Sequence, residues 1–189
     1  HTALGVEREL RAAMLHTNLS AVAPIDPELV RSVLKAHRTS VALRPLGVGL
    51  AEFAGPGQPW VQLWAVTPSG ALSEAEALLR RSAPTSDCFI AGVGDCTLPS
   101  VAARLFQAED RRIHIVELHV ARMRALLEIV DLSAALRDRR LLLHAGPRAI
   151  ETLGPFAQGA LAQPDSVVGG DAMAISLLRA AAGLEPLGN

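Results

Sequence analysis

Two glycines and two acids in the middle of the chain have the spacing of a nucleotide or cofactor site. Gly92 and Gly94 follow an apolar run at 88–91, Asp95 comes directly after them, and Glu117 ends the next apolar run. A glycine turn after a buried strand lets backbone approach a ligand, and an acid ending the next strand can accept hydrogen bonds from ribose hydroxyls. The pattern predicts the start of a Rossmann-type site, with these four residues as candidate cofactor contacts.

Each of these residues also has a purely structural explanation. Glycine is common in tight strand-to-helix turns because positive φ costs it little. Asp95 or Thr97 can cap the helix that follows, and Glu117 can pair with Arg122 or Arg124. The third glycine of the dinucleotide pattern is absent, since Thr97 stands at its position. We therefore expect an adenosine or S-adenosylmethionine (SAM) type of ligand rather than a seated pyrophosphate.

Histidine and cysteine supply fewer candidates. His144 ends a third apolar run, where ligand sites of open α/β sheets form, so we include it among the cofactor-binding candidates. His114 and His119 lie on either side of Glu117, but zinc usually needs about three or four protein ligands. We expect these two to be core or surface histidines and predict no metal site. Cys96 has no diagnostic partner, and neither a Gly-x-Ser-x-Gly elbow nor a phosphate-binding Gly-Lys-Ser/Thr loop occurs. The catalytic residues are unknown from the sequence.

Composition limits the class of partner. The 189 residues are 50% hydrophobic, which suffices for a well-cored domain, and the formal net charge is only -1. There is no tyrosine and only 3% aromatic residues, which argues against base-stacking surfaces and hence against nucleic acid. Two cysteines without a C-x-x-C spacing or a secretory signal indicate a cytoplasmic protein, and no apolar stretch reaches the roughly 18–20 residues of a membrane span. We expect the chain to be part of a longer protein whose other domains are its partners.

The pattern of apolar residues and breakers predicts the order of elements. We expect helices at 3–17 and 26–37, a hairpin of strands near 40–50 and 60–66 with its turn at 55–59, and a helix to 81 that starts at a Ser73–Glu76 capping box. Strands are then expected at 88–91, 113–117 and 140–144, alternating with helices at 98–107, 120–129 and 132–137, and two further helices follow Gly146 and Asp171. This alternation predicts a Rossmann-like α/β fold, a parallel sheet with helices on both faces. We assign 1–70 to a small α+β N-terminal extension and 71–189 to the Rossmann-like domain.

Several of these segments together resemble a known family. They are residues 89–95, 115–117, 131–133 with Leu136, and 140–146. In combination they resemble the Rossmann-like region near the N-terminus of motility accessory factor and related bacterial glycosyltransferases, over about residues 87–147. The resemblance implies a module attached to a sugar-transferring enzyme that acts in protein or cell-surface glycosylation, with a fold similar to SAM-dependent methyltransferases. That family often has an aromatic residue and a histidine soon after its turn, where this chain has Cys96, Thr97 and Leu98.

The sequence supports three hypotheses. The first is an accessory or nucleotide-binding domain of a larger glycosyltransferase, with SAM or a nucleotide sugar as the ligand. The second is a SAM-dependent methyltransferase, although no Asp/Asn-Pro-Pro-aromatic element is present to bind a methyl acceptor. The third is a non-catalytic interaction domain with a degenerate pocket. An open, acid-lined space above Gly92 and Gly94 would favour the first two, and a blocked space would favour the third.

Overall fold

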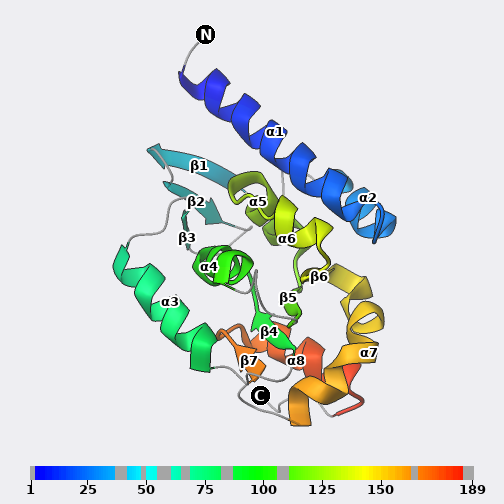
Figure 1. Ribbon diagram of the computed structural model, residues 1–189. Coiled ribbons are helices and arrows are strands. Elements are labelled where there is room, and N and C mark those ends of the chain that lie inside the picture. The colour runs from blue at the N-terminus through cyan, green and yellow to red at the C-terminus, as the bar shows by residue number, and fades with distance from the viewer. Residues whose placement is uncertain are drawn as a thin grey trace.

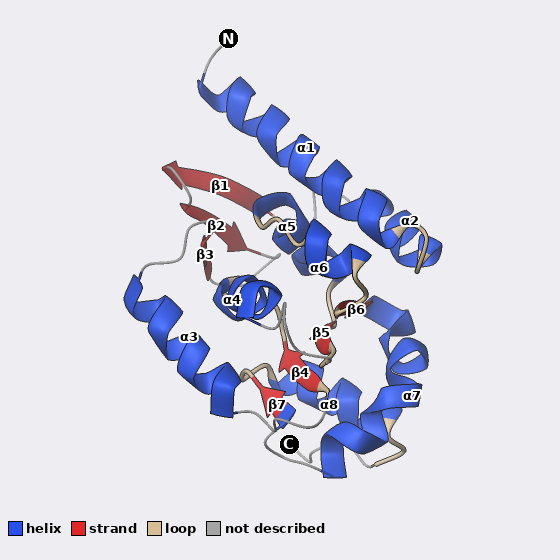
Figure 2. Cartoon of the chain, viewed as in Figure 1, coloured by secondary structure: helices blue, strands red, loops and turns tan. Residues whose placement is uncertain are grey.

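Figures 1 and 2 show the computed structural model, which describes residues 3–36, 42–47, 50–54, 61–64, 69–81, 87–105, 111–162 and 166–184. Its helices are α1 (Ala3–Val22), α2 (Pro27–Lys35), α3 (Ser69–Arg81), α4 (Thr97–Leu105), α5 (Val120–Ile129), α6 (Ser133–Arg137), the 3-10 helix η3 (Gly146–Arg148), α7 (Ala149–Ala162) and α8 (Ala172–Ala181). Its strands are β1 (Ala42–Gly47), β2 (Leu50–Ala54), β3 (Val61–Trp64), β4 (Cys88–Ala91), β5 (Ile113–Glu117), β6 (Leu141–Ala145) and β7 (Val167–Val168). Within the described ranges, no helix combines the length and apolarity needed to cross a bilayer.

Four strands form a parallel sheet in the order β6-β5-β4-β7. Cys88 pairs with Ile113, and Ile113 pairs with Leu141, so β4, β5 and β6 begin at the same level. The chain then crosses back through η3 and α7, and β7 joins the free side of β4, where Phe89 pairs with Val167. Strand β4, the first of these four in the chain, thus has β5 and β6 on one side and β7 on the other, as the first strand of a Rossmann sheet does. The predicted Rossmann-like α/β fold is confirmed.

Helices cover both faces of this sheet. Along β4, Cys88 and Ile90 belong to the main core, which also contains side chains of α1, α4, α5 and α6. Phe89 and Ala91 belong to a smaller core with side chains of α7 and α8. Successive side chains of a strand point to opposite faces, so a strand that is covered on both faces is apolar throughout, as β4 is. In Figure 1, α7 and α8 lie across the sheet from α1, α5 and α6.

The small sheet formed by β1, β2 and β3 differs from the predicted hairpin. It is antiparallel with the order β1-β2-β3, so three strands stand where two were predicted. The single strand predicted at 40–50 is wrong, because β1 ends at Gly47 and β2 begins at Leu50 and is paired antiparallel with β1. Gly47 and Gly49 were the sequence signal for a break between two strands, but the apolar residues around them led to the prediction of a single strand. Strands β2 and β3 are paired on either side of the predicted 55–59 turn, which itself lies outside the described residues.

Two predicted helix starts have opposite outcomes. Asp26 caps α2 as predicted, accepting a hydrogen bond from the Leu29 amide at 2.9 Å with Pro27 in the first turn. Helix α3 begins at Ser69, a full turn before Ser73, and the Ser73 hydroxyl donates to the Ser69 carbonyl at 3.1 Å. Serine inside a helix commonly bonds to the carbonyl one turn back. The capping box predicted at Ser73 is therefore wrong.

Besides its apolar side chains in the main core, helix α1 is joined to the Rossmann-like part by a buried polar side chain. Asn18 is 0% exposed. Its amide nitrogen donates to the carbonyls of Leu127 at 2.9 Å and Val130 at 2.7 Å, and its oxygen accepts from the Leu132 amide at 2.9 Å. These carbonyls and this amide lie where α5 ends and α6 begins, so Asn18 satisfies backbone groups that the helix ends leave without partners. The predicted two-domain division remains a prediction.

Candidate functional site

The glycine turn predicted after β4 is present. Gly92 has a φ of 86° and Gly94 a φ of 57°, and the buried Cys96 also has a positive φ, 72°. The Gly92 amide donates to the Val116 carbonyl at 2.8 Å, which continues the β4–β5 pairing past the end of β4. Positive φ is costly for residues with a Cβ, so glycine is the natural residue at both turn positions.

The space directly above Gly92 is filled by Asp171. A Cβ atom on Gly92 would lie 2.6 Å from the Asp171 Cβ, closer than two non-bonded carbon atoms approach. This is the switch point of the sheet, between the carboxyl ends of β4 and β7, where Rossmann-like sheets usually bind their ligands. A Cβ on Gly94, by contrast, would meet nothing within 4 Å. The turn is therefore closed at its first glycine and open at its second.

Asp171 is held in this position by its own hydrogen bonds. Its Oδ1 caps α8, accepting from the amides of Met173 at 2.9 Å and Ala174 at 3.1 Å. Its Oδ2 lies 3.5 Å from the Arg122 guanidinium, and its own amide donates to the Ala91 carbonyl at 3.4 Å. The sequence predicted a helix after Asp171 but no role for the residue itself. Gly169-Gly170-Asp171 directly before a helical pattern was the available signal of a tight turn and an N-cap.

Glu117 is committed to the backbone of the same site. The side chain is 0% exposed. Its Oε2 accepts from the Val93 amide in the glycine turn at 3.1 Å, and its Oε1 accepts from the His119 amide at 2.9 Å. Hydrogen bonds from backbone amides to a carboxylate are among the stronger ones in proteins. Both oxygens therefore hold the loops after β4 and β5 together, and the predicted contact to ribose hydroxyls remains a prediction.

Asp95 takes the capping role that the sequence left open between two residues. Its Oδ1 accepts from the Thr97 amide at 2.9 Å, at the start of α4. The Thr97 hydroxyl is buried and has no hydrogen-bond partner within the described part of the chain. Asp95 is therefore occupied at the helix start, and Thr97 is not the cap.

His144 is the one predicted site residue that the structure does not bring to the turn. It is 4% exposed and pairs in register with Val116, facing α7. Its Nε2 lies 2.9 Å from Nδ1 of His114, and its Nδ1 lies 2.8 Å from the Thr152 hydroxyl of α7. The other ring nitrogen of His114, Nε2, lies 3.2 Å from Oδ2 of Asp87. We call these four residues, Asp87, His114, His144 and Thr152, the histidine chain.

Burial keeps both histidines neutral. It lowers the pKa of His114 to about 4, because the opposing effect of Asp87 is smaller and Arg112 adds to the lowering. It lowers the pKa of His144 to about 3, with a further contribution from the charge of His114. Burial alone would raise the pKa of Asp87, but hydrogen bonds from Arg112 and His114 outweigh it and hold that pKa below its usual value. A neutral imidazole pair beside an ionised carboxylate results.

The predictions for the remaining candidates have mixed outcomes. His114 is a core histidine and His119 is exposed, as expected. No group of three or more metal-binding side chains was found among the residues that the structure describes. The sequence places two basic pairs, Arg111-Arg112 and Arg139-Arg140, at strand entrances and predicts that they are solvated surface. Arg112 and Arg139 are exposed, whereas Arg111 is 8% exposed. That prediction is wrong for Arg111, which the fold buries just before β5.

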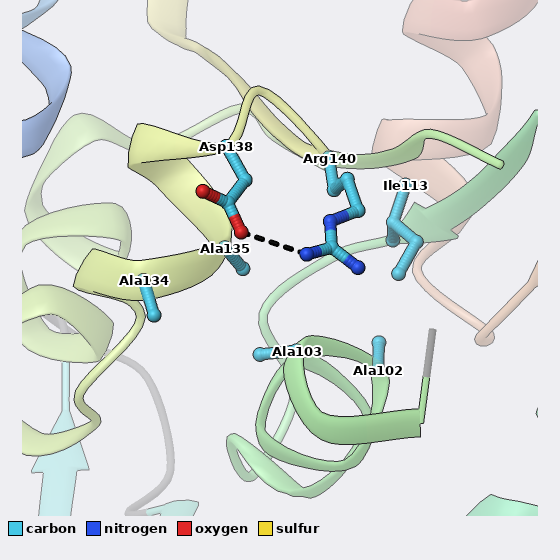
Figure 3. A pocket seen from close by; sticks show the side chains of 7 residues that line it. All are labelled: Ala102, Ala103, Ile113, Ala134, Ala135, Asp138 and Arg140. Carbon is cyan, nitrogen blue, oxygen red and sulfur yellow. Dashed lines mark hydrogen bonds and ion pairs between the residues drawn. The ribbon is translucent and has the colours of Figure 1, made fainter. Parts of the chain in front are cut away.

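A hollow of about 180 Å³ lies at the opposite end of the sheet from the glycine turn. Figure 3 shows that its walls are alanines facing each other from α4 and α6, with the Asp138–Arg140 ion pair at 2.7 Å on its rim. The lining residues are Ala102, Ala103, Ile113, Ala134, Ala135, Asp138 and Arg140. Pockets for drug-sized ligands usually measure roughly 300–1,000 Å³, so this hollow is too small for a nucleotide sugar.

Comparison with known proteins adds no family to this picture. No family model matches the chain, and no curated protein or solved structure is significantly similar to it.

Proposed function

We propose that this chain is a non-catalytic, Rossmann-like accessory domain of a bacterial glycosyltransferase that acts in protein or cell-surface glycosylation. The link to glycosylation rests on the resemblance of residues 89–95, 115–117, 131–133 and 140–146 to the motility accessory factor family. The non-catalytic role rests on the position of Asp171, whose Cβ occupies the place above Gly92 that a ligand would need. In this proposal the domain organises neighbouring domains of its parent enzyme.

The hydrogen bonding of the site supports this role. A ribose that bonded to Glu117 would have to replace the hydrogen bonds that this carboxylate accepts from the amides of Val93 and His119. These amides would then need other partners. It would also have to move Asp171, which caps α8 and lies beside Arg122. Leaving a buried polar group without a partner costs about 1–3 kcal/mol each. The site is therefore complete without a ligand.

Calorimetric titration tests the absence of a ligand. The purified chain would be titrated with SAM, S-adenosylhomocysteine and a panel of nucleotide sugars, and we expect no binding heat. The matched variants are Asp171→Gly, which clears the space above Gly92, and Asp171→Asn, which keeps both the volume and a capping oxygen. Binding gained by Asp171→Gly alone would identify Asp171 as the block. Nucleotide-sugar binding by the unmodified chain would overturn the non-catalytic role.

Deletion in the host bacterium tests the link to glycosylation. Removing the coding region for this chain is expected to strip glycan from a surface or secreted protein, read out as a loss of mass in the intact protein. Unchanged glycan masses would refute the link. Because this experiment does not depend on ligand binding, the two parts of the proposal can fail separately.

A methyltransferase is the second candidate, and a specific observation favours it. The strand order β6-β5-β4-β7 and the open backbone at Gly94 are both what a SAM site in such a sheet requires. SAM binding by the unmodified chain that is weakened in Glu117→Gln would favour this candidate over the accessory role.

A further inference from the structure

The histidine chain crosses the face of the sheet that α7 and α8 cover. His114 on β5 and His144 on β6 are diagonal neighbours on this face, because Val116 is the residue directly paired with His144. Diagonal neighbours on adjacent strands are within reach of long side chains. The His114 ring stacks on Phe89 at 4.5 Å with an interplanar angle of 9°, and Phe156 of α7 lies 4.6 Å away. Packing therefore fixes the rings that the hydrogen bonds join.

The neutral chain has a single direction of hydrogen bonding. Arg112 holds Asp87 with contacts of 2.9 and 3.3 Å, so the carboxylate is ionised and can only accept. Nε2 of His114 must then donate to Asp87, which makes its Nδ1 an acceptor for Nε2–H of His144. Nδ1 of His144 in turn accepts from the Thr152 hydroxyl. Every donor finds an acceptor, and both histidines carry their proton on Nε2.

One added proton allows a second arrangement that is equally complete. The Thr152 oxygen lies 3.3 Å from the carbonyls of Arg148 and Ala149, so its hydroxyl can donate there instead. Thr152 would then accept from Nδ1–H of His144, and His144 would accept at Nε2 from Nδ1–H of His114. His114 would be an imidazolium between His144 and the carboxylate of Asp87.

We propose that Asp87, His114, His144 and Thr152 form a two-state proton relay built into the α7 face of the sheet. A proton arriving at the Thr152 oxygen forms a new O–H bond as the original hydroxyl proton passes to Nδ1 of His144. The Nε2 proton of His144 passes to Nδ1 of His114. One proton enters at Thr152, and the positive charge appears on His114, beside Asp87.

The two ends of the relay lie in different surroundings. Thr152 lines a hollow of about 10 Å³ between α2, β6 and α7, together with Asp26 and Arg148, and that volume is close to what one water molecule needs. Asp87 is 22% exposed and pairs with Arg112 at the surface. The charged groups that face the two histidines among the described residues are Asp87, which favours an imidazolium, and Arg112, which opposes it. The relay thus couples protonation between α2 and α7 to charge at the Asp87–Arg112 pair.

Nitrogen NMR of the imidazole rings tests the relay in the ¹⁵N-histidine-labelled chain. At pH 7.5 we expect His114 and His144 both to carry their proton on Nε2. In Asp87→Ala, an Nε2–H of His114 would have no acceptor, whereas an unprotonated Nε2 leaves no donor without a partner. Both rings should then carry the proton on Nδ1 at unchanged pH. Nε2–H rings in this variant, or an Nδ1–H ring in the unmodified protein, would overturn the proposal.

Acidification provides a second readout. On lowering the pH of the unmodified chain, His114 should gain a proton on Nδ1 at the same midpoint at which His144 moves its proton from Nε2 to Nδ1. Thr152→Val leaves Nδ1 of His144 without a partner and should move that midpoint to lower pH. Thr17→Val, which replaces an exposed threonine bonded only within α1, is the control and should leave the midpoint unchanged. Independent titration of the two histidines would overturn the coupling.

Discussion

The hydrogen bonds of Asn18 allow a quantitative prediction of how much this side chain contributes to the free energy of unfolding. In Asn18→Ala, two carbonyls and one amide at the α5–α6 junction lose partners that now lie at 2.7–2.9 Å. A buried polar group without a partner costs about 1–3 kcal/mol, and water entering the new cavity would lessen the loss. We therefore expect the free energy of unfolding to fall by about 3–5 kcal/mol.

Equilibrium unfolding in urea, followed by circular dichroism, measures this loss. Thr17→Ala, one residue away, is the control. Thr17 is exposed and bonds only to the Ala13 carbonyl of its own helix, so its change should stay within about 0.5 kcal/mol. Asn18→Leu restores volume without polar groups, and a loss close to that of Asn18→Ala would assign the effect to hydrogen bonds. A loss for Asn18→Ala no larger than that for Thr17→Ala would refute the reasoning.

Three further predictions concern the buried and paired groups. Because the folded pKa values of His114 and His144 lie below the ordinary histidine value of 6.5, the unfolded chain binds more protons between about pH 6.5 and 4. Equilibrium unfolding at a series of pH values should show no loss of stability from this protonation above this window. As the pH falls through it, the free energy of unfolding should decrease by up to roughly 1.4 kcal/mol per pH unit for each histidine. Cys96, whose thiol pKa burial raises, should react with thiol reagents only as fast as the chain unfolds, which a time course with and without urea would show. Arg124 donates to carbonyls at the end of α2, so Arg124→Met should lower the free energy of unfolding by about 1–3 kcal/mol and speed amide exchange in that helix. Arg104→Met, which removes an exposed bond within α4, is the control and should change neither.

Local chemistry explains the parts of the fold that the sequence predicted well. Asp26 before Pro27 is a cap and a first-turn proline, and neither depends on distant residues. The apolar runs at β4, β5 and β6 predicted strands correctly because strands buried on both faces have little alternation. Ser73 shows the limit of local sequence patterns, because it has a good capping pattern and yet α3 begins one turn earlier, at Ser69.

The site itself could be predicted only in its local half. The glycine turn and the acid ending β5 lie within 30 residues of sequence, but Asp171 reaches Gly92 only because β7 returns to pair with β4. No pattern around Asp171 specifies that return. His114 and His144 likewise meet because β5 and β6 are neighbours in the sheet, and Thr152 reaches His144 because α7 packs over them.

The glycine-and-acid pattern has a physical explanation here that does not require a ligand. A turn with positive φ at Gly92 leaves the Val93 amide directed at the end of β5, and a carboxylate at position 117 is the side chain that can accept from it while also accepting from His119. A glycine turn and a carboxylate at the end of the next strand would also suit a ribose. The pattern by itself therefore indicates the geometry of the turn and does not show that a ligand binds there. Asp171 decides between the two uses, because among the described residues its atoms lie nearest to the position above Gly92 that a ligand would occupy. Chains with this pattern should therefore be distinguished by the residues that come after the strand on the free side of β4, where this chain has Asp171.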